Sequence, residues 1–176
     1  VKLPDAIDYD TAAAMMLLRR GRPQSVESFG IDALLAVLMT ALGPLTDAIA
    51  QYKEQFRQKV ADPIKATMSA ATQNLIDSGI ADQTLKVGET FPAISLPNAT
   101  GQAIAIQDLL RSGPVVISFY RGGLCPYCNL ELKALQDKLP EIKALGAQLV
   151  AISPETPDTS LSTAEKNELE FEVLSD

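Results

Sequence analysis

The residues best suited to chemistry are Cys125 and Cys128, the only two cysteines of the 176-residue chain. Thiols three positions apart can close into a disulfide, so that one attacks a substrate and the other resolves the intermediate. The chain contains no histidine, which excludes Cys-His nucleophile pairs, imidazole general bases and histidine metal ligands. Two thiolates alone supply half of a tetrahedral zinc site. The pattern favours redox chemistry. The alternatives are simple packing and half a zinc site completed by a second chain.

A strand and a helix are predicted to position the two thiols. Residues 115–120 are β-branched and aromatic, apolar on both faces except for Ser118, as in a strand buried within a sheet. The pair Gly122-Gly123 then allows a sharp turn into a helix that extends through Leu139. At a helix N-terminus the unpaired N–H groups and the helix dipole favour thiolate over thiol, and Arg121 adds a positive charge. We therefore expect at least one thiol to have a lowered pKa.

The rest of the C-terminal half is typical of an α/β fold. Residues 149–152 and 171–174 are predicted strands, and Ser162-Thr163-Ala164-Glu165 is a capping box that would open a short helix between them. Two short strands, over 91–96 and 103–106, are predicted to flank a turn. Strands that alternate with helices in this order predict a sheet with parallel strands.

The N-terminal half is predicted to be helical and carries no cluster that could do chemistry. We expect a helical segment of unknown role over 1–45, with helices at Thr11–Arg20 and Ile31–Leu42 and a break at Gly43-Pro44. A helical hairpin is expected over 46–84, and the α/β domain over 85–176. In the hairpin, Thr46–Val60 forms the first helix, and the second has Pro63 in its first turn and is capped at Gly79. The apolar faces of the hairpin predict a homo-oligomer.

The composition narrows the range of partners. The net charge of −7 argues against nucleic acid and anionic membranes. The most apolar window, Ile31–Leu42, is shorter than the roughly 20 residues that span a bilayer. Basic residues before it (Arg19, Arg20 and Arg22) resemble an export signal, but Glu27 and Asp32 favour an amphipathic helix instead. We therefore expect a cytoplasmic protein.

The segment Phe119-Tyr120-Arg121-Gly122-Gly123-Leu124-Cys125-Pro126-Tyr127-Cys128-Asn129-Leu130-Glu131 resembles the AhpC/TSA peroxiredoxin-like proteins, which carry an F-Y-R-G-G-x-C-P-Y-C signature. The stretch from Lys86-Val87-Gly88 to Leu96-Pro97 is similar to the opening of their domain, although Phe91 intervenes before Pro92. The resemblance extends over residues 46–176. It implies a thioredoxin-like fold and a thiol peroxidase that reduces hydrogen peroxide or organic hydroperoxides. A disulfide would form and be reduced by an external thioredoxin-like dithiol or a glutathione-type reductant, without a metal or organic cofactor.

The resemblance also assigns roles to residues. Ordinary peroxiredoxins have P-x-x-x-T-x-x-C followed three residues later by Glu, which places the peroxidatic cysteine at Cys128 and the glutamate at Glu131. The threonine falls on Cys125 and the proline on Arg121, and both differ from the pattern. The register favours Cys128 as the attacking thiol, whereas the logic of thioredoxin-type C-x-x-C pairs favours Cys125. We expect Cys128, with Tyr120 of the same signature completing the site.

The 85–176 segment is short for a peroxiredoxin domain. The family continues with a helix, two strands, a cis-proline loop and an arginine, so the domain is expected to lack its C-terminal part. Without later strands, the strands at 115–119 and 149–152 are expected to leave an open edge. Two other functions remain as alternatives: a thioredoxin-like thiol-disulfide oxidoreductase that acts on proteins, and a non-catalytic helical assembly module with a vestigial C-x-x-C.

Overall fold

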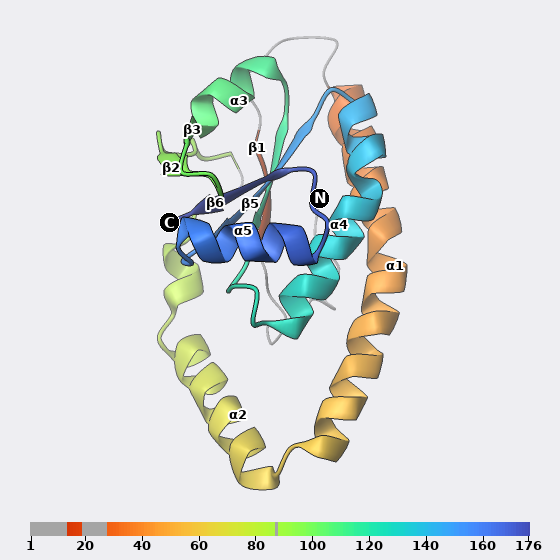
Figure 1. Ribbon diagram of the computed structural model, residues 1–176, viewed down its shortest axis with the longest axis vertical. Coiled ribbons are helices and arrows are strands. Elements are labelled where there is room, and N and C mark those ends of the chain that lie inside the picture. Colours follow the sequence, from red (N-terminus) through yellow and green to blue (C-terminus); the bar gives the residue numbers. More distant parts are fainter. Residues whose placement is uncertain (1–13, 19–27, 87) are drawn as a thin grey trace. The chain divides into compact units, whose positions relative to one another are not determined.

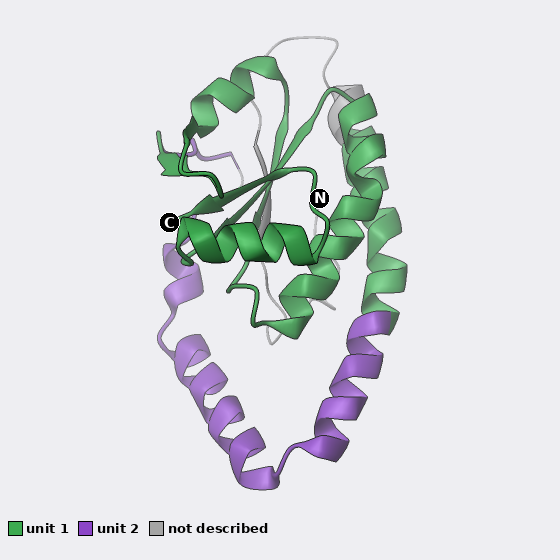
Figure 2. Ribbon diagram, viewed as in Figure 1, with its two compact units in different colours: residues 1–47, 93–176 green, residues 48–92 purple. Residues whose placement is uncertain are grey.

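The computed structural model describes residues 14–18, 28–86 and 88–176 (Figure 1). The chain divides into two compact units, residues 1–47 with 93–176, and residues 48–92 (Figure 2). The expected boundaries were 45/46 and 84/85. Both the expected first boundary and the observed one at 47/48 fall inside one continuous helix. The basic residues of the export-signal interpretation, and the predicted helix outside 14–18, lie outside the described residues.

The centre of the first unit is a four-stranded sheet with the order β1-β4-β5-β6. Strands β4 (Val115–Phe119), β5 (Gln148–Ser153) and β6 (Glu172–Ser175) are parallel, which confirms the predicted sheet. Helices α4 (Pro126–Ala144) and α5 (Pro157–Lys166) connect them (Figure 1). The central strands are buried on both faces, as their continuous apolar sequences predict.

The helix predicted at Thr11–Arg20 is wrong within its described part, because β1 (Ala14–Leu18) is a strand. It pairs antiparallel with β4, from Ala14 opposite Phe119 to Leu18 opposite Val115. A short apolar run does not distinguish a strand from a buried helix, and a distant partner decides the outcome. Strand β4 therefore has a neighbour on each side, and the open edge expected there is filled.

The break predicted at Gly43-Pro44 is also wrong, because α1 (Ser28–Lys59) is continuous through Pro44. A proline removes one helical hydrogen bond and crowds the preceding turn, but good helix formers on both sides can carry a helix past it. The hydroxyl of Thr46 donates to the Leu42 carbonyl at 2.7 Å in the adjacent turn. At its N-terminal end, Leu34 and Leu38 pack in one buried cluster with Val116 and residues of α4.

By length and composition, residues 32–59 of α1 could also cross a membrane, the one such segment in the part of the chain that the structure describes. This differs from the sequence expectation, which considered only the window Ile31–Leu42. Core helices of soluble proteins pass the same test, and Leu34, Leu38 and Ala41 are buried here.

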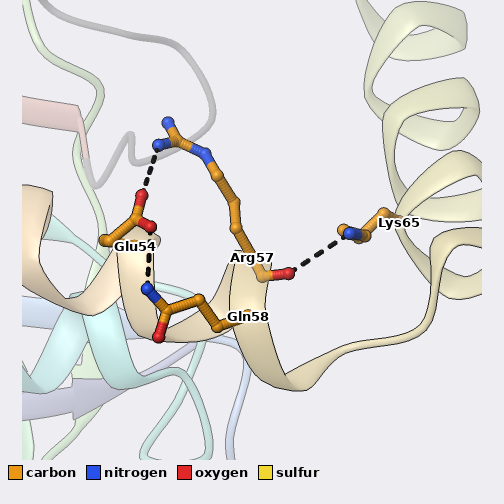
Figure 3. A network of polar contacts seen from close by, with 4 residues as sticks. All are labelled: Glu54, Arg57, Gln58 and Lys65. Carbon is orange, nitrogen blue, oxygen red and sulfur yellow. Dashed lines mark hydrogen bonds and ion pairs between the residues drawn. The ribbon is translucent and has the colours of Figure 1, made fainter.

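The second unit, residues 48–92, contains the end of α1 and helix α2 (Asp62–Asp77), which has Pro63 in its first turn as predicted. Gly79 follows with a left-handed φ of 65° and leads into the short 3-10 helix η2 (Ile80–Gln83). The link between the helices includes a hydrogen bond from Lys65 Nζ to the Arg57 carbonyl at 3.2 Å, close to the Glu54–Arg57 ion pair (Figure 3). Helix α2 has no buried side chain.

The remaining elements depart from the predictions mainly at their ends. Strand β2 (Ser95–Pro97) is shorter than expected, and β3 (Ala103–Ala105) pairs with it in a hairpin. Helix α3 (Ile106–Ser112) was not predicted. Helix α4 continues past Leu139 through Pro140. Helix α5 begins at Pro157 rather than at the predicted capping box, because extended Thr156 and a proline in the first turn already start a helix.

Candidate active site

The two cysteines lie where β4 leads into α4, as predicted. Cys125 is the N-cap residue of α4, and Pro126 occupies the first helical turn. The Cys125 sulfur accepts a hydrogen bond from the Cys128 backbone N–H at 3.4 Å. Both thiols are free, and Cys125 is the more exposed of the two. Arg121 and Tyr120 precede the turn, and Glu131 lies one turn farther along α4, so β4, α4 and their connection supply all five predicted site residues.

The surroundings of Cys125 favour its thiolate. The Arg121 Nη2 donates to the Cys125 sulfur at 3.1 Å. Burial alone would raise the pKa of this thiol, but hydrogen bonds from Cys128 and Arg121, together with the charge of Arg121, lower it overall. This agrees with the expectation that one thiol has a lowered pKa at the start of the helix.

Cys128 has the opposite environment. Its side chain is 4% exposed and packs in a cluster with Tyr120, Leu132, Ala151 and Val173. Burial, followed by the interaction with the Cys125 sulfur, raises the pKa of Cys128 to about 11. The geometry therefore favours Cys125 as the attacking thiol, whereas the family register led us to expect Cys128.

Glu131 points away from water, toward strand β4. Its Oε1 accepts a hydrogen bond from the buried Ser118 hydroxyl at 3.0 Å. Burial raises the pKa of Glu131 to about 7, and the bond from Ser118 only partly offsets that rise. Sequence reasoning did not name Ser118 as a site residue. The available signal was a single hydroxyl in an otherwise apolar strand.

The Tyr120 side chain is 3% exposed and faces inward, not toward a substrate. Burial raises the pKa of its phenol, and the charge of Glu155 adds to that rise. Ser153, Ser160 and Thr163 lie close enough to oppose that rise in pKa, but none reaches the hydroxyl with hydrogen-bond geometry. Tyr120 therefore contributes to the core beside Cys128.

Sequence reasoning missed the polar residues that hold the loop before Cys125. Gly123 N–H donates to both carboxylate oxygens of Glu155, at 3.1 and 3.0 Å. From the other side, Asn129 Nδ2 donates to the carbonyls of Gly123 and Cys125 at 2.8 and 3.0 Å. The only sequence signal was the glycine pair, which fits a close approach of other chain segments.

Within the described ranges, His, Cys, Asp and Glu side chains form no group of three or more that could hold a metal ion. The site therefore offers two thiols of unequal pKa, one arginine beside the exposed thiol, and a buried carboxyl group close to the second thiol in sequence. In such an arrangement, a free thiolate can be oxidised to a sulfenic acid, and the second thiol can then convert the sulfenic acid to a disulfide.

Known proteins are similar to the C-terminal half of the chain. Peroxiredoxin Bcp of Escherichia coli K12 is 33% identical over 92 residues, which cover 52% of this chain and 58% of that protein. A putative peroxiredoxin Bcp of Haemophilus influenzae is 36% identical, with 52% and 59% covered. The crystal structure of peroxidoxin BcpB from Mycobacterium tuberculosis superposes with a TM-score of 0.51 at 31% identity, and covers 53% of this chain and 60% of that one.

The chain thus spans less than two thirds of the length of each of these relatives. Over the shared part, the likeness confirms the predicted thioredoxin-like α/β fold. The AhpC/TSA family model matches residues 87–176, just over half of the chain. The chain therefore belongs to the AhpC/TSA family.

Proposed function

We propose that this chain carries the reactive centre of a thiol-dependent peroxidase that reduces hydrogen peroxide or organic hydroperoxides. The observation that carries the proposal is the contact of 3.1 Å between Arg121 Nη2 and the Cys125 sulfur. It places a fixed positive charge and a hydrogen-bond donor on the more exposed thiol, at the N-terminus of a helix. Membership of a family that includes peroxiredoxins supports the same chemistry.

In the proposed first step, the Cys125 thiolate attacks one oxygen of the hydroperoxide. An S–O bond forms while the O–O bond breaks, so the sulfur is oxidised to a sulfenic acid and the peroxide is reduced to an alcohol or water. The leaving oxygen takes up a proton from solvent. Arg121 keeps the sulfur ionised before the attack and lies beside the atoms on which negative charge develops.

In the second step, Cys128 attacks the Cys125 sulfur, a disulfide forms, and the sulfenic oxygen leaves as water. A thiol with a pKa of about 11 is almost wholly protonated at neutral pH, so it needs a base. We assign this role to Glu131, which follows Cys128 by one helical turn and has a pKa of about 7. A carboxyl group with this pKa can accept a proton and release it again near neutrality.

An external reductant would then reduce the disulfide, either one thioredoxin-like dithiol or two molecules of a glutathione-type thiol. A protein reductant has an apolar contact available, because the Leu124 side chain directly before Cys125 is 95% exposed. We propose a cytoplasmic location, because the chain has one C-x-x-C pair rather than the many widely spaced cysteines of a secreted domain stapled by disulfides.

Stopped-flow measurement of hydrogen peroxide consumption by the reduced protein tests this function. We expect a burst of one equivalent per chain, followed by turnover when dithiothreitol is added. Cys128→Ser should accumulate a sulfenic acid on Cys125 that a dimedone probe labels, whereas Cys125→Ser should neither consume peroxide nor be labelled. Labelling of Cys128 in the Cys125→Ser protein would restore the assignment made from the family register.

A second candidate is a thiol-disulfide oxidoreductase that acts on proteins. The observation in its favour is that a thiol, Cys125, takes the place of the threonine in the peroxiredoxin pattern, with a buried partner thiol behind it. Reduction of insulin disulfides by the reduced protein, measured beside peroxide consumption, separates the two. Rapid insulin reduction with peroxide consumption no faster than that of free cysteine would favour this candidate.

A further inference from the structure

The loop from Arg121 to Cys125 is held by residues from a distant part of the sequence. The Glu155 carboxylate lies between β5 and α5 and accepts the Gly123 N–H with both oxygens, at 3.1 and 3.0 Å. The Thr163 hydroxyl of α5 lies 3.4 Å from the same carboxylate and also has the Thr159 carbonyl at 3.1 Å as an acceptor for its single proton. The Glu155 N–H donates to Ser153 Oγ at 3.3 Å. Glu155 is therefore fixed on its own side and bonded to the loop on the other.

The two glycines of the signature fit this contact closely. A Cβ on Gly122 would lie 2.5 Å from Glu155 Oε1, and the φ of 137° at Gly122 is one that side chains rarely adopt. A Cβ on Gly123 would overlap the Thr163 hydroxyl. The glycine pair thus has two functions. It allows the sharp turn of the loop, and its missing side chains leave the space that Glu155 and Thr163 occupy.

A second set of bonds holds the opposite side of the loop. Asn129 Nδ2 bonds to the carbonyls of Gly123 and Cys125, and Asn129 Oδ1 accepts from Asn167 Nδ2 at 2.8 Å. Asn167 also donates to the Thr163 carbonyl at 2.9 Å. Both sets lead back to α5, so the loop is positioned as one connected unit.

We propose that Glu155 is a positioning residue, which holds the loop in the conformation where the Arg121 guanidinium reaches the Cys125 sulfur. The inference rests on the proposed function, because it concerns the same thiol. Glu155 has two opposing effects on that thiol. Its negative charge disfavours a nearby thiolate, whereas its hydrogen bonds keep the donors of the thiolate in place. The second effect is the larger of the two.

The test compares Glu155→Gln with Glu155→Ala, each combined with Cys128→Ser so that only Cys125 can react. The reaction rate with iodoacetamide as a function of pH gives the pKa of the Cys125 thiol. Glutamine loses the charge but keeps an acceptor for Gly123 N–H, so this pKa should stay unchanged or fall. Alanine loses both, so this pKa should rise and alkylation at neutral pH should slow several-fold. Asp158→Asn, which removes an exposed charge at the start of α5, is the control and should match Glu155→Gln.

Equal behaviour of Glu155→Gln and Glu155→Ala, in either direction or with no shift, would overturn the inference. Where Glu155→Ala does not fold, Gly123→Ala replaces it. That variant should raise the pKa of Cys125 because its methyl group displaces Thr163. In the double variant Gly123→Ala/Thr163→Ala, the pKa of Cys125 should return to the value measured in Thr163→Ala alone. Absence of restoration would also overturn the inference. An ordinary pKa for Cys125 in the Cys128→Ser parent would instead count against the proposed function.

Discussion

Residues 115–176 and residues 48–92 use their side chains in opposite ways. In the first region, the strands and α4 bury apolar faces, and polar groups inside it are paired over long sequence distances, such as Ser118 with Glu131 and Ser160 with Ser175. In the second region, α2 buries no side chain. Its network of Glu54, Arg57, Gln58 and Lys65 joins residues only three to eight positions apart.

This difference shows where specific geometry can be maintained. Buried polar groups must find partners of fixed position, because an unpaired one is costly in a low-dielectric interior. All five predicted site residues lie in the region where such pairs occur. Contacts between successive helical turns stabilise a helix only slightly, and they position nothing from elsewhere in the chain.

The largest expected effect comes from the core around the second thiol. Leu132 is 1% exposed and packs beside Cys128 and Tyr120. Leu132→Ala should lower the free energy of unfolding by about 2–5 kcal/mol, because it removes buried methyl groups and leaves a cavity. Ile76→Ala in α2, where Ile76 is 54% exposed, should change it by less than about 0.5 kcal/mol. Urea denaturation measures both, and similar losses would contradict the comparison between the two regions.

The next effect is a pH dependence of stability that originates at Glu131. In the unfolded chain this carboxyl has its ordinary pKa of 4.5, and in the folded chain its pKa is about 7. Between these values the folded state keeps a proton that the unfolded state has released. Stability therefore falls as the pH rises from about 4.5 to about 7. The difference corresponds to at most about 3 kcal/mol.

Glu131→Gln should abolish this decline, because glutamine does not titrate and can still accept the hydrogen bond from Ser118. Glu165→Gln, at an exposed position of α5, is the matched control and should leave the decline intact. Urea denaturation at several pH values between 4.5 and 7 gives the two slopes. If the wild-type and Glu131→Gln slopes were the same, the carboxyl would not be buried as described.

A smaller and more local effect is expected at Arg121. Arg121→Ala removes the donor that lies 3.1 Å from the Cys125 sulfur, so the pKa of Cys125 should rise and its alkylation at neutral pH should slow several-fold. Arg121→Lys should restore part of the rate, since it keeps the charge but not the planar geometry. Stability should barely change, because the Arg121 side chain is exposed. An unchanged alkylation rate in Arg121→Ala would leave the helix N-terminus as the main cause of the lowered pKa.

The sequence predicted the parts of this molecule whose signals are local. Continuous β-branched runs marked β4 and β5, Pro63 and Gly79 marked the limits of α2, and the glycine pair marked the turn before the cysteines. Strand β1 was missed because Ala-Met-Met-Leu-Leu suits either a helix or a strand, and its pairing with β4 joins residues about a hundred positions apart.

The same limit applies to the site. The sequence indicated the two thiols and Arg121, but the order of the thiols depended on burial, which no motif encodes. The Glu155–Gly123 and Asn167–Asn129 contacts span 32 and 38 residues, respectively. Nothing in the local sequence of Glu155 or Asn167 indicates these partners. The Glu155–Gly123 contact follows from the parallel pairing of β4 and β5, which brings together the loops that follow their carboxyl ends.

The last prediction concerns the exposed apolar side chains of residues 48–92 and has the smallest expected effect on the fold of a single chain. Ile64, Met68 and Leu75 follow helical spacing along one side of α2 and are 55%, 48% and 59% exposed. Such a row usually marks an interface, and a homo-oligomer remains our prediction. Replacing all three with serine should leave urea denaturation of the sheet region within about 1 kcal/mol of wild type. It should also convert an oligomer to monomer in sedimentation equilibrium at tens of micromolar.

The double variant Ala66→Ser/Ala70→Ser, on the opposite side of α2, is the control for the lower helix propensity of serine and should leave the oligomer intact. A wild-type chain that sediments as a monomer at this concentration would contradict the predicted homo-oligomer. The apolar side chains of α2 would then face solvent and not a second copy of the chain.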